Sequence, residues 1–317
     1  MHKVIYDTDP GVDDAMALLF LHHHPDIDLL GITTVFGNAS IETTTRNALF
    51  LKREWEIPCP VARGAGVCYD PGRSPDAPPA WIHGQDGLGN IGVPDVSEMI
   101  VDPRSAHQFI IDTVRAHPGE VTLVAVGRMT NLANALKADP AIVGLVKSVV
   151  IMGGAFDAYG NVSPAAEANI FGDPAAADVI FTADWDVVAV PLDVTSKTIM
   201  TRAFLAEMAS MGGPRVELLA KISQFYIDFY EQIVDDGMML HDSCACVYVV
   251  APELFKTRSG AVRVACGSVA DGQTIQKPDG MHFGKSDWDV HKSQLVTVEC
   301  DDQAILKLVR DVILRRS

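Results

Sequence analysis

Hydrophobic positions along the chain follow two alternating patterns, short apolar runs rich in β-branched residues and longer stretches with the spacing of a helix. The first run begins at Val4 and predicts a short buried strand. A turn at Pro10 and Gly11 follows it, and an apolar stretch from Val12 predicts a helix that ends near His24. The chain is therefore expected to start with a strand, a tight turn and a helix.

The same alternation of strands and helices continues to the C-terminus. Further strands are predicted at residues 29–35, near Val61, and at 121–126, 148–152, 186–191, 260–266 and 294–299. Further helices are predicted at residues 41–55, 103–116, 131–137, 174–182, 214–235, 242–250 and 302–314. This order is typical of an α/β fold with an open, mostly parallel sheet and helices on both faces, in which ligands bind beyond the carboxyl ends of the strands.

Composition and charge indicate a globular protein that acts on a small molecule. The 317 residues are 48% hydrophobic and 21% charged, and Gly and Pro are spread along the chain instead of marking a linker, so a single domain over residues 1–317 is expected. The formal net charge of -16 repels phosphate groups. It therefore disfavours nucleic-acid polymers and anionic membranes as partners and favours a neutral or cationic small molecule.

The sequence also predicts a cytoplasmic location. Asp7 and Asp9 lie where a signal peptide would need its apolar segment, and no apolar stretch reaches the roughly 18 residues of a membrane helix. The six cysteines show neither a CxxC pair nor the spacing of a zinc site, so they are expected to be reduced thiols.

Four carboxylates crowd the first turn of the chain. Asp7 and Asp9 end the first strand, and Asp13 and Asp14 fall in the first turn of the helix, where the helix dipole offsets only part of their repulsion. Crowded carboxylates raise one another's pKa unless a cation compensates them, and an all-oxygen set suits Ca2+ or Mg2+. The alternative is that one Asp caps the helix and the others are solvated. Four acidic residues in so short a stretch favour the metal site.

Polar groups also follow other predicted strands at the same edge of the sheet. Val126 ends one of these strands and exposes a backbone carbonyl, which is a known type of ligand for Ca2+. The loop after the next strand carries Asn161, Glu167 and Asn169. These side chains could bridge the hydroxyls of a polyol, or they could be ordinary solvated turn residues.

His241 and Asp242 begin another predicted helix. Asp242 could merely cap this helix, or it could complete the metal shell, with His241 facing the ligand.

A glycine-rich segment at 87–92 matches the GxGxxG pattern of dinucleotide-binding sites. No predicted strand precedes it, and Pro94 follows where a helix should continue. The segment is therefore not expected to bind a dinucleotide.

These residues resemble the signature of a known family. Residues 7–14, Asp-Thr-Asp-Pro-Gly-Val-Asp-Asp, are similar to the motif of the inosine-uridine-preferring nucleoside hydrolases. The resemblance covers nearly the whole chain and continues through residues 36–38, 83–84 with 87–88, 126 with 130–133, 152–154, 161 with 164–169, 192–195 and 241–242. It implies a nucleoside hydrolase fold with a Rossmann-like core, a homodimer or homotetramer, and Ca2+-dependent hydrolysis of the N-glycosidic bond of purine or pyrimidine ribonucleosides to ribose and free base.

The resemblance also implies a role for each residue of the site. The calcium ligands would be the side chains of Asp9, Asp14 and Asp242 and the carbonyl of Val126. The residues expected to contact the substrate are Asp13 and Asn169 at the 2' and 3' hydroxyls, Glu167 and Asn161 at the 5' hydroxyl, Asn38 at the sugar, Asp242 beside the metal, and His83 with His241 in the base pocket. One departure is Ala168, because related enzymes often carry an aromatic residue at this position, and its absence leaves the stacking of the base open.

The chemistry of glycosidic cleavage fits these residues. The reaction passes through an oxocarbenium-like ribosyl cation, so an enzyme must deliver water, stabilise positive charge and improve the leaving group. Asp9 is predicted to take the proton of a metal-bound water and His241 to help protonate the departing base, with inversion at the anomeric carbon. Two alternatives remain: a Mg2+-dependent phosphotransferase that uses Asp7 and Asp9, and a nucleoside-binding protein without catalysis.

Overall fold

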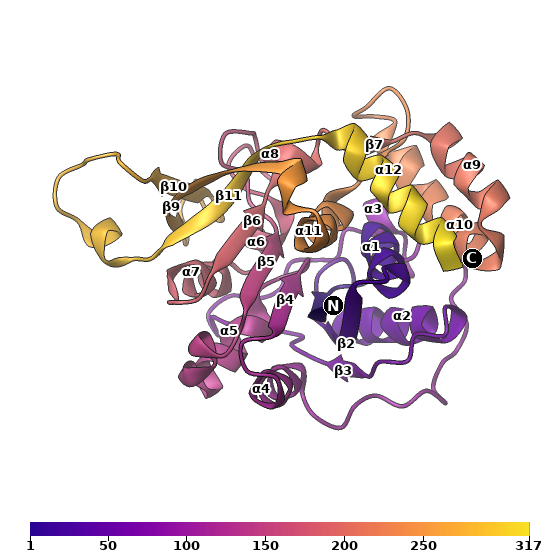
Figure 1. The fold of residues 1–317 in the computed structure, drawn as a ribbon, viewed down its shortest axis with the longest axis horizontal. Coiled ribbons are helices and arrows are strands. Elements are labelled where there is room, and N and C mark those ends of the chain that lie inside the picture. The colour runs from indigo at the N-terminus through magenta and orange to yellow at the C-terminus, as the bar shows by residue number, and fades with distance from the viewer. Residues whose placement is uncertain (317) are drawn as a thin grey trace.

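The computed structural model describes residues 1–316, and a nine-stranded sheet forms its centre (Figure 1). In chain order the strands of this sheet are β1 (His2–Thr8), β2 (Ile27–Thr34), β3 (Val61–Arg63), β4 (Val121–Ala125), β5 (Ser148–Met152), β6 (Val187–Val190), β9 (Phe255–Val264), β10 (Thr274–Pro278) and β11 (Ser293–Cys300). They lie side by side in the order β10-β9-β11-β6-β5-β4-β1-β2-β3. Neighbours from β11 to β3 are parallel, whereas β9 runs antiparallel to β11 and β10. The predicted open, mostly parallel sheet is confirmed, and the order β3-β2-β1-β4-β5-β6 is that of a Rossmann-like core.

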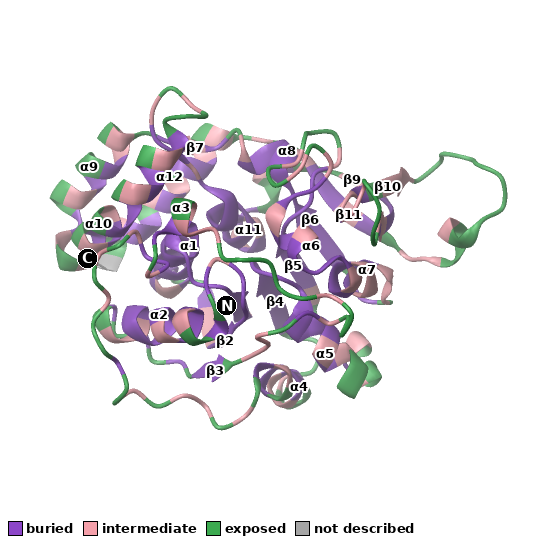
Figure 2. Ribbon diagram, turned by 180° about the vertical axis from the view of Figure 1, so that it is seen from behind, coloured by how far each residue is buried: buried purple, intermediate pink, exposed green. Residues whose placement is uncertain are grey.

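Helices cover both faces of the sheet, as the sequence predicts. The longer helices are α1 (Val12–His23), α2 (Ile41–Glu54), α4 (Ala106–Ala116), α5 (Thr130–Ala138), α7 (Pro174–Thr182), α9 (Arg202–Met211), α10 (Gly213–Tyr230), α11 (His241–Val250) and α12 (Asp302–Ile313). Along β1, Val4 and Tyr6 pack into a core with α1, α2, α10, α11 and α12, whereas Ile5 packs into a core with α4, α5 and α7. This alternation follows from the pleat, which points successive side chains to opposite faces. Figure 2 shows the central strands buried and the exposed residues on the outer sides of the helices.

Short elements connect these layers. The short helices are α3 (Ala80–His83), α6 (Ala168–Gly172) and α8 (Leu192–Thr195), with the 3-10 helices η1 (Pro140–Gly144), η2 (Pro252–Leu254), η3 (Asp287–Val290) and η4 (Leu314–Arg316). The strands β7 (Ile199–Met200) and β8 (Met238–Met239) form a separate antiparallel pair. The three short α-helices each bring residues to the pocket described below.

The structure differs from the predicted elements mainly after residue 200. The sequence does not predict α9, because only Leu205 and Met208 of this helix are buried and two residues make too weak an apolar stripe. β9 begins at Phe255 instead of residue 260, since its first half carries polar side chains at a sheet edge, and β10 is not predicted. The helix predicted at 214–235 ends at Tyr230, and the one predicted at 103–116 begins at Ala106.

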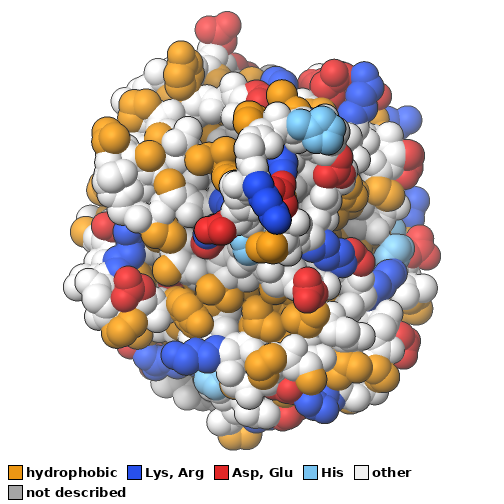
Figure 3. All heavy atoms as spheres, turned by 90° about the vertical axis from the view of Figure 1, so that its left-hand side faces the viewer, with side chains coloured by type: hydrophobic (Ala, Val, Ile, Leu, Met, Phe, Trp, Pro, Cys, Tyr) orange, Lys and Arg blue, Asp and Glu red, His pale blue; other side chains and the backbone are white. Residues whose placement is uncertain are grey.

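β9, β10 and the loop from β10 to β11 project from the body of the molecule (Figure 1). Figure 3 views this end and shows Lys and Arg side chains interspersed with Asp and Glu side chains. Lys277 pairs with Asp289, and Lys292 lies 2.7 Å from Asp186. The net negative charge of the chain is therefore not concentrated on this face.

The glycine-rich segment at 87–92 is a tight loop around the Asp86 carboxylate. This carboxylate accepts hydrogen bonds from the backbone N–H groups of Leu88, Asn90 and Gly92. No strand precedes the segment directly and no helix continues from it. It therefore lacks the strand and helix of a dinucleotide-binding motif, as the sequence indicates.

The six cysteines are free thiols, as the sequence predicts, and four of them are buried. Within residues 1–316 we find no helix with the length and apolar character that crossing a bilayer requires.

Candidate active site

The carboxyl ends of the parallel strands β1, β4 and β5 lie at the same edge of the sheet. Strand β1 has β2 on one side and β4 on the other, so the order of the strands reverses direction at β1. Such a switch point leaves a crevice between the connecting loops. A pocket of about 600 Å³ lies there. It is lined by nine of the residues that the sequence assigns to the site: Asp13, Asn38, His83, Val126, Asn161, Glu167, Asn169, His241 and Asp242. Asp9 and Asp14 lie behind this lining and contact Asn38.

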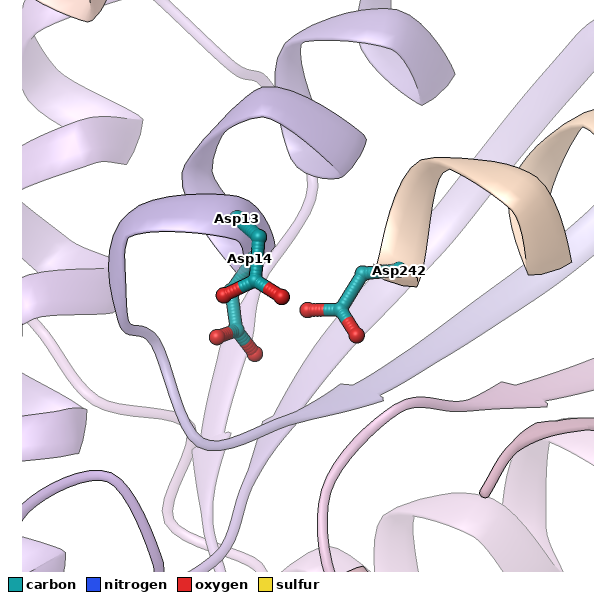
Figure 4. Close-up of side chains that lie close together, drawn as sticks. All are labelled: Asp13, Asp14 and Asp242. Carbon is teal, nitrogen blue, oxygen red and sulfur yellow. The ribbon is translucent and has the colours of Figure 1, made fainter. Parts of the chain in front are cut away.

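Three carboxylates lie close together at the wall of the pocket (Figure 4). Asp13 and Asp14 come from the first turn of α1, and Asp242 comes from the first turn of α11, which packs against α1. One oxygen of each can be chosen so that all lie within 4.8 Å of one another, and all three residues are buried. Asp9 is not part of this close group. Its negative charge nevertheless acts on Asp242, and that of Asp14 acts on Asp9.

Burial makes this cluster unfavourable without a cation. Burial and the neighbouring Asp14 carboxylate raise the pKa of Asp13 to about 8. Burial and the charges of Asp13 and Asp14 raise the pKa of Asp242 well above its usual value, and burial with Asp14 does the same to the pKa of Asp9. A divalent cation would offset this repulsion, and an all-oxygen donor set suits a hard ion. The buried Oδ1 atom of Asp9, which has no hydrogen-bond partner, fits the same interpretation.

Asn38 holds two of the carboxylates in place. Its backbone N–H donates to Oδ2 of Asp9 at 2.8 Å, and its side-chain Nδ2 donates to Oδ2 of Asp14 at 2.9 Å. The N–H of Gly11 also donates to Oδ2 of Asp14 at 2.9 Å, and the hydroxyl of Thr8 donates to Oδ1 at 2.5 Å. The turn between β1 and α1 therefore fixes the direction of Asp14, while Oδ1 of Asp9 stays free.

The loop between β5 and α6 is built around Glu167. Its carboxylate accepts hydrogen bonds from the backbone N–H groups of Gly154, Asn169 and Ile170 at 2.9 to 3.1 Å. Nδ2 of Asn169 donates to the carbonyl of Val126 at 2.7 Å. The same nitrogen donates to a second carbonyl at the end of β5, so Oδ1 is the polar atom of Asn169 that remains for a ligand.

Two histidines occupy the wall opposite this loop. His241 lies between two hydroxyls, with Nδ1 at 2.8 Å from Thr195 and Nε2 at 2.8 Å from Tyr230. The ring of His83 lies 5.2 Å from the ring of Tyr226. Burial lowers the pKa of His241 to about 4, and burial with the charge of His241 lowers the pKa of His83 to about 3. Both rings are therefore neutral at neutral pH.

The sequence does not assign roles to several residues that the structure brings to the site, namely Arg128, Tyr226 and Tyr230. Tyr226 and Tyr230 are four positions apart on α10 and so share one face of it, a spacing that the sequence contains. Arg128 follows the strand end at Val126 by two positions, and its Nη1 lies 3.5 Å from Oδ2 of Asp9. Its charge next to an acidic site is a signal that sequence reasoning could have used.

Comparison with known proteins agrees with this geometry. A family profile described as inosine-uridine preferring nucleoside hydrolase matches residues 4–307. The "Probable uridine nucleosidase 1" of Oryza sativa subsp. japonica is 38% identical over 316 residues, which cover 98% of this chain and 96% of the rice protein. A solved plant nucleoside hydrolase has a TM-score of 0.94 at 35% identity, with 99% of both chains covered. The purine-preferring ribonucleoside hydrolase from Gardnerella vaginalis has a TM-score of 0.91 at 33% identity, with 98% of both chains covered.

The fold is therefore that of a hydrolase that acts on N-glycosyl compounds. The chain belongs to the inosine-uridine preferring nucleoside hydrolase family, as its motifs imply. It is a nucleoside hydrolase, and the predicted nucleoside hydrolase fold is confirmed.

Proposed function

We propose that this enzyme uses Ca2+ to hydrolyse the N-glycosidic bond of purine and/or pyrimidine ribonucleosides, giving ribose and the free base. One observation carries the proposal: the carboxylates of Asp13, Asp14 and Asp242 lie close together, and Asp13 and Asp242 line the same pocket as Glu167. A ribose diol offers both metal ligands and hydrogen-bonding groups, and this pocket presents partners for both. We further propose that residues 1–317 act as one domain, assembled as a homodimer or homotetramer in the cytoplasm.

Asp9, Asp14, Asp242 and the carbonyl of Val126 would hold the ion. When bound, Ca2+ would orient and acidify a water molecule and chelate the ribose diol. Asp9 takes the proton of the attacking water as general base, because its Oδ1 is buried and has no partner. Val126 can contribute its carbonyl although Asn169 already donates to it, because a carbonyl oxygen has two lone pairs.

Hydrogen-bonding side chains orient the sugar. Asp13 and Asn169 bind the 2' and 3' hydroxyls, with Oδ1 of Asn169 as the free acceptor. Glu167 and Asn161 bind the 5' hydroxyl, and Asn161 keeps its Nδ2 for this purpose because its Oδ1 accepts from a backbone N–H. Asn38 contacts the sugar from the side of the metal ligands. Holding the ribose in this way places the anomeric carbon for attack, an orientation effect that lowers the barrier.

The departing base is protonated on the opposite side of the sugar. His241 and His83 line this part of the pocket, and both are neutral, so His241 can donate only the one N–H that its tautomer carries. Both ring nitrogens of His241 contact hydroxyls, so its proton reaches the base through the hydroxyl of Tyr230, which lines the pocket. His241 therefore acts as a relay to the leaving group, with His83 beside it.

Aromatic side chains elsewhere in the pocket compensate for Ala168. Trp81, Tyr226 and Phe229 line it, and aromatic faces bind flat bases by stacking. Trp81 is 65% exposed, so it can pack on a ligand without displacing a core contact. Stacking of this kind accepts purines and pyrimidines alike.

A substrate panel tests the proposal. Purified protein with Ca2+ is incubated with inosine, adenosine, guanosine, uridine and cytidine, and ribose release is followed by a reducing-sugar assay. We expect release from at least one of the five and none after chelation. Folded protein that binds nucleosides but releases no ribose from any of them in the presence of Ca2+ would identify a binding protein and contradict the proposed activity.

A further inference from the structure

Arg128 brings a positive charge next to the Asp9 carboxylate. Among the described residues that line the pocket it is the only Lys or Arg, and its side chain is 10% exposed. The guanidinium lies 4.9 Å from the centre of the Phe36 ring, and its Nη1 donates to the Phe36 carbonyl at 3.2 Å. Stacking on an aromatic face and a hydrogen bond from the planar fork together hold the group in one orientation.

Two glycines leave room for this guanidinium. A Cβ atom built on Gly37 would lie 1.8 Å from Oδ2 of Asp9 and 2.1 Å from Nη1 of Arg128, and one built on Gly172 would lie 2.0 Å from Nε of Arg128. No side chain other than hydrogen fits at either position while Arg128 stays where it is. The backbone after β2 and at the end of α6 is thus shaped around the guanidinium.

The guanidinium acts on one oxygen of Asp9. Oδ2 of Asp9 accepts from the Asn38 N–H at 2.8 Å and lies 3.5 Å from Nη1 of Arg128, whereas Oδ1 is buried without a partner. Both contacts therefore fall on the same side of the carboxylate. A single contact would leave the group free to rotate about its last bond, and a second contact restricts that rotation.

We propose that Arg128 is a positioning residue for Asp9: together with the Asn38 N–H it fixes Oδ2, so that Oδ1 alone faces the attacking water and accepts its proton. The inference rests on the proposed hydrolysis and adds to it a residue with no assigned role. The Nη1 atom of Arg128 is directed at Phe36 and Asp9, and its Nε is buried beside Gly172 without a partner, so these two nitrogens are turned to the protein.

The test compares Arg128→Met and Arg128→Lys with the wild type. Both kcat and KM for the best substrate of the panel are measured at saturating Ca2+, and the affinity for Ca2+ alone is measured by calorimetry. We expect Arg128→Met to lower kcat by about 10- to 100-fold, the usual effect of removing a group that orients an active-site ligand, with KM and Ca2+ stoichiometry little changed. Arg128→Lys keeps the charge without the planar fork, so its kcat should lie between the kcat of the wild type and that of Arg128→Met.

Arg104→Met is the matched control. Arg104 also stacks on a ring, 4.6 Å from the centre of Phe109, and pairs with Asp102 at 2.8 Å, but it lies outside the pocket. Its loss should leave kcat unchanged. If Arg128→Met folds poorly, Arg128→Ala is tested with and without added guanidinium ion. The ion can enter the space beside Gly37 and Gly172 that the arginine side chain leaves, so it should restore kcat.

The outcomes separate this inference from the proposed function. A wild-type protein that cleaves no ribonucleoside contradicts the proposed function itself. An active wild type with unchanged kcat in Arg128→Met overturns the positioning role alone. A rise in KM with unchanged kcat would assign Arg128 to substrate binding, and a loss that excess Ca2+ fully restores would assign it to metal binding; either result also overturns the inference.

Discussion

The Nε2 atom of His241 lies 2.8 Å from the hydroxyl oxygen of Tyr230, while Nδ1 lies 2.8 Å from the hydroxyl of Thr195. Tyr230 in turn accepts a hydrogen bond from Tyr226 at 3.4 Å, and the ring of Tyr226 packs beside His83. A row of polar groups therefore runs along the wall where the departing base is proposed to lie. A neutral imidazole between two hydroxyls can accept a proton on one nitrogen and release one from the other.

His241→Ala should slow inosine hydrolysis by about 100- to 10,000-fold, the range of general acid–base catalysis, because the base must then leave without a proton. A nitrophenyl riboside has a leaving group that is stable as an anion and should be cleaved at nearly the original rate. The measurement is kcat/KM on both substrates. Comparable losses on both, or none on either, would exclude His241 from leaving-group activation.

Tyr230→Phe offers a milder version of the same experiment. It removes the hydroxyl that contacts His241 but keeps the ring, which packs against Tyr226 and Phe229. We expect a loss no larger than that for His241→Ala, again selective for inosine over the nitrophenyl riboside. A loss that is equal on the two substrates would indicate a general disturbance of the pocket instead of a broken relay.

Asp14→Asn and Asp242→Asn should each abolish tight Ca2+ binding and most activity, because each removes a negative charge from a buried, all-oxygen ligand set. The wild type is expected to bind roughly one Ca2+ per chain by calorimetry. Exhaustive chelation should stop hydrolysis, and added Ca2+ should restore it. Full activity after chelation would contradict a metal-dependent mechanism.

Inosine should be cleaved far faster than 2'-deoxyinosine. The 2' hydroxyl is a proposed partner of Asp13, Asn169 and the ion, and each hydrogen-bonding group left unpaired in a buried site costs about 1 to 3 kcal/mol. The comparison of kcat/KM for the two nucleosides measures this directly. Asn169→Ala should lower kcat/KM for inosine and narrow the difference between the two substrates, whereas equal turnover by the wild type would contradict the assignment of the ribose loop.

The metal-free protein should lose stability as the pH rises from about 6.5 to about 8. Burial raises the pKa of Asp7 to about 7, and burial with Asp14 raises the pKa of Asp13 to about 8, whereas the unfolded chain has already ionised both groups. The folded state therefore binds more protons in this range, so its stability falls with pH. His83 and His241, with pKa values lowered to about 3 and 4, are neutral when folded, whereas each is about half protonated in the unfolded chain at pH 6.5. They therefore offset part of the loss at the lower end of this range, and the two carboxyl groups dominate above it.

Thermal melting at both pH values, with chelator and with saturating Ca2+, checks this expectation. The decrease in Tm should be larger with chelator, because the ion replaces protons in offsetting the carboxylate charges. Asp13→Asn should reduce the decrease seen with chelator. A decrease in Tm of equal size with and without Ca2+ would contradict the proposal that the ion offsets the charges of the buried carboxylates.

Local patterns predict the first half of the fold well because the forces that define it are local. The apolar run at the start of the chain, the turn at Pro10 and Gly11 and the acidic first helical turn each follow from neighbouring residues, and β1 and α1 form where they are expected. The chain after residue 200 is predicted less well. There α9 and β10 depend on packing and on pairing with β9, and neither leaves a clear periodic pattern in the sequence.

The sequence by itself determined the residues of the site, nine of which line one pocket. Several of them follow parallel strands, whose common direction brings their carboxyl ends to one edge of the sheet. Only the tertiary structure decided how these residues face one another. Asp242 meets Asp13 because α11 packs on α1, and Arg128 reaches Asp9 because β4 lies beside β1. These contacts join segments far apart in the chain, and their geometry depends on the packing of whole elements, which no local spacing of residues encodes.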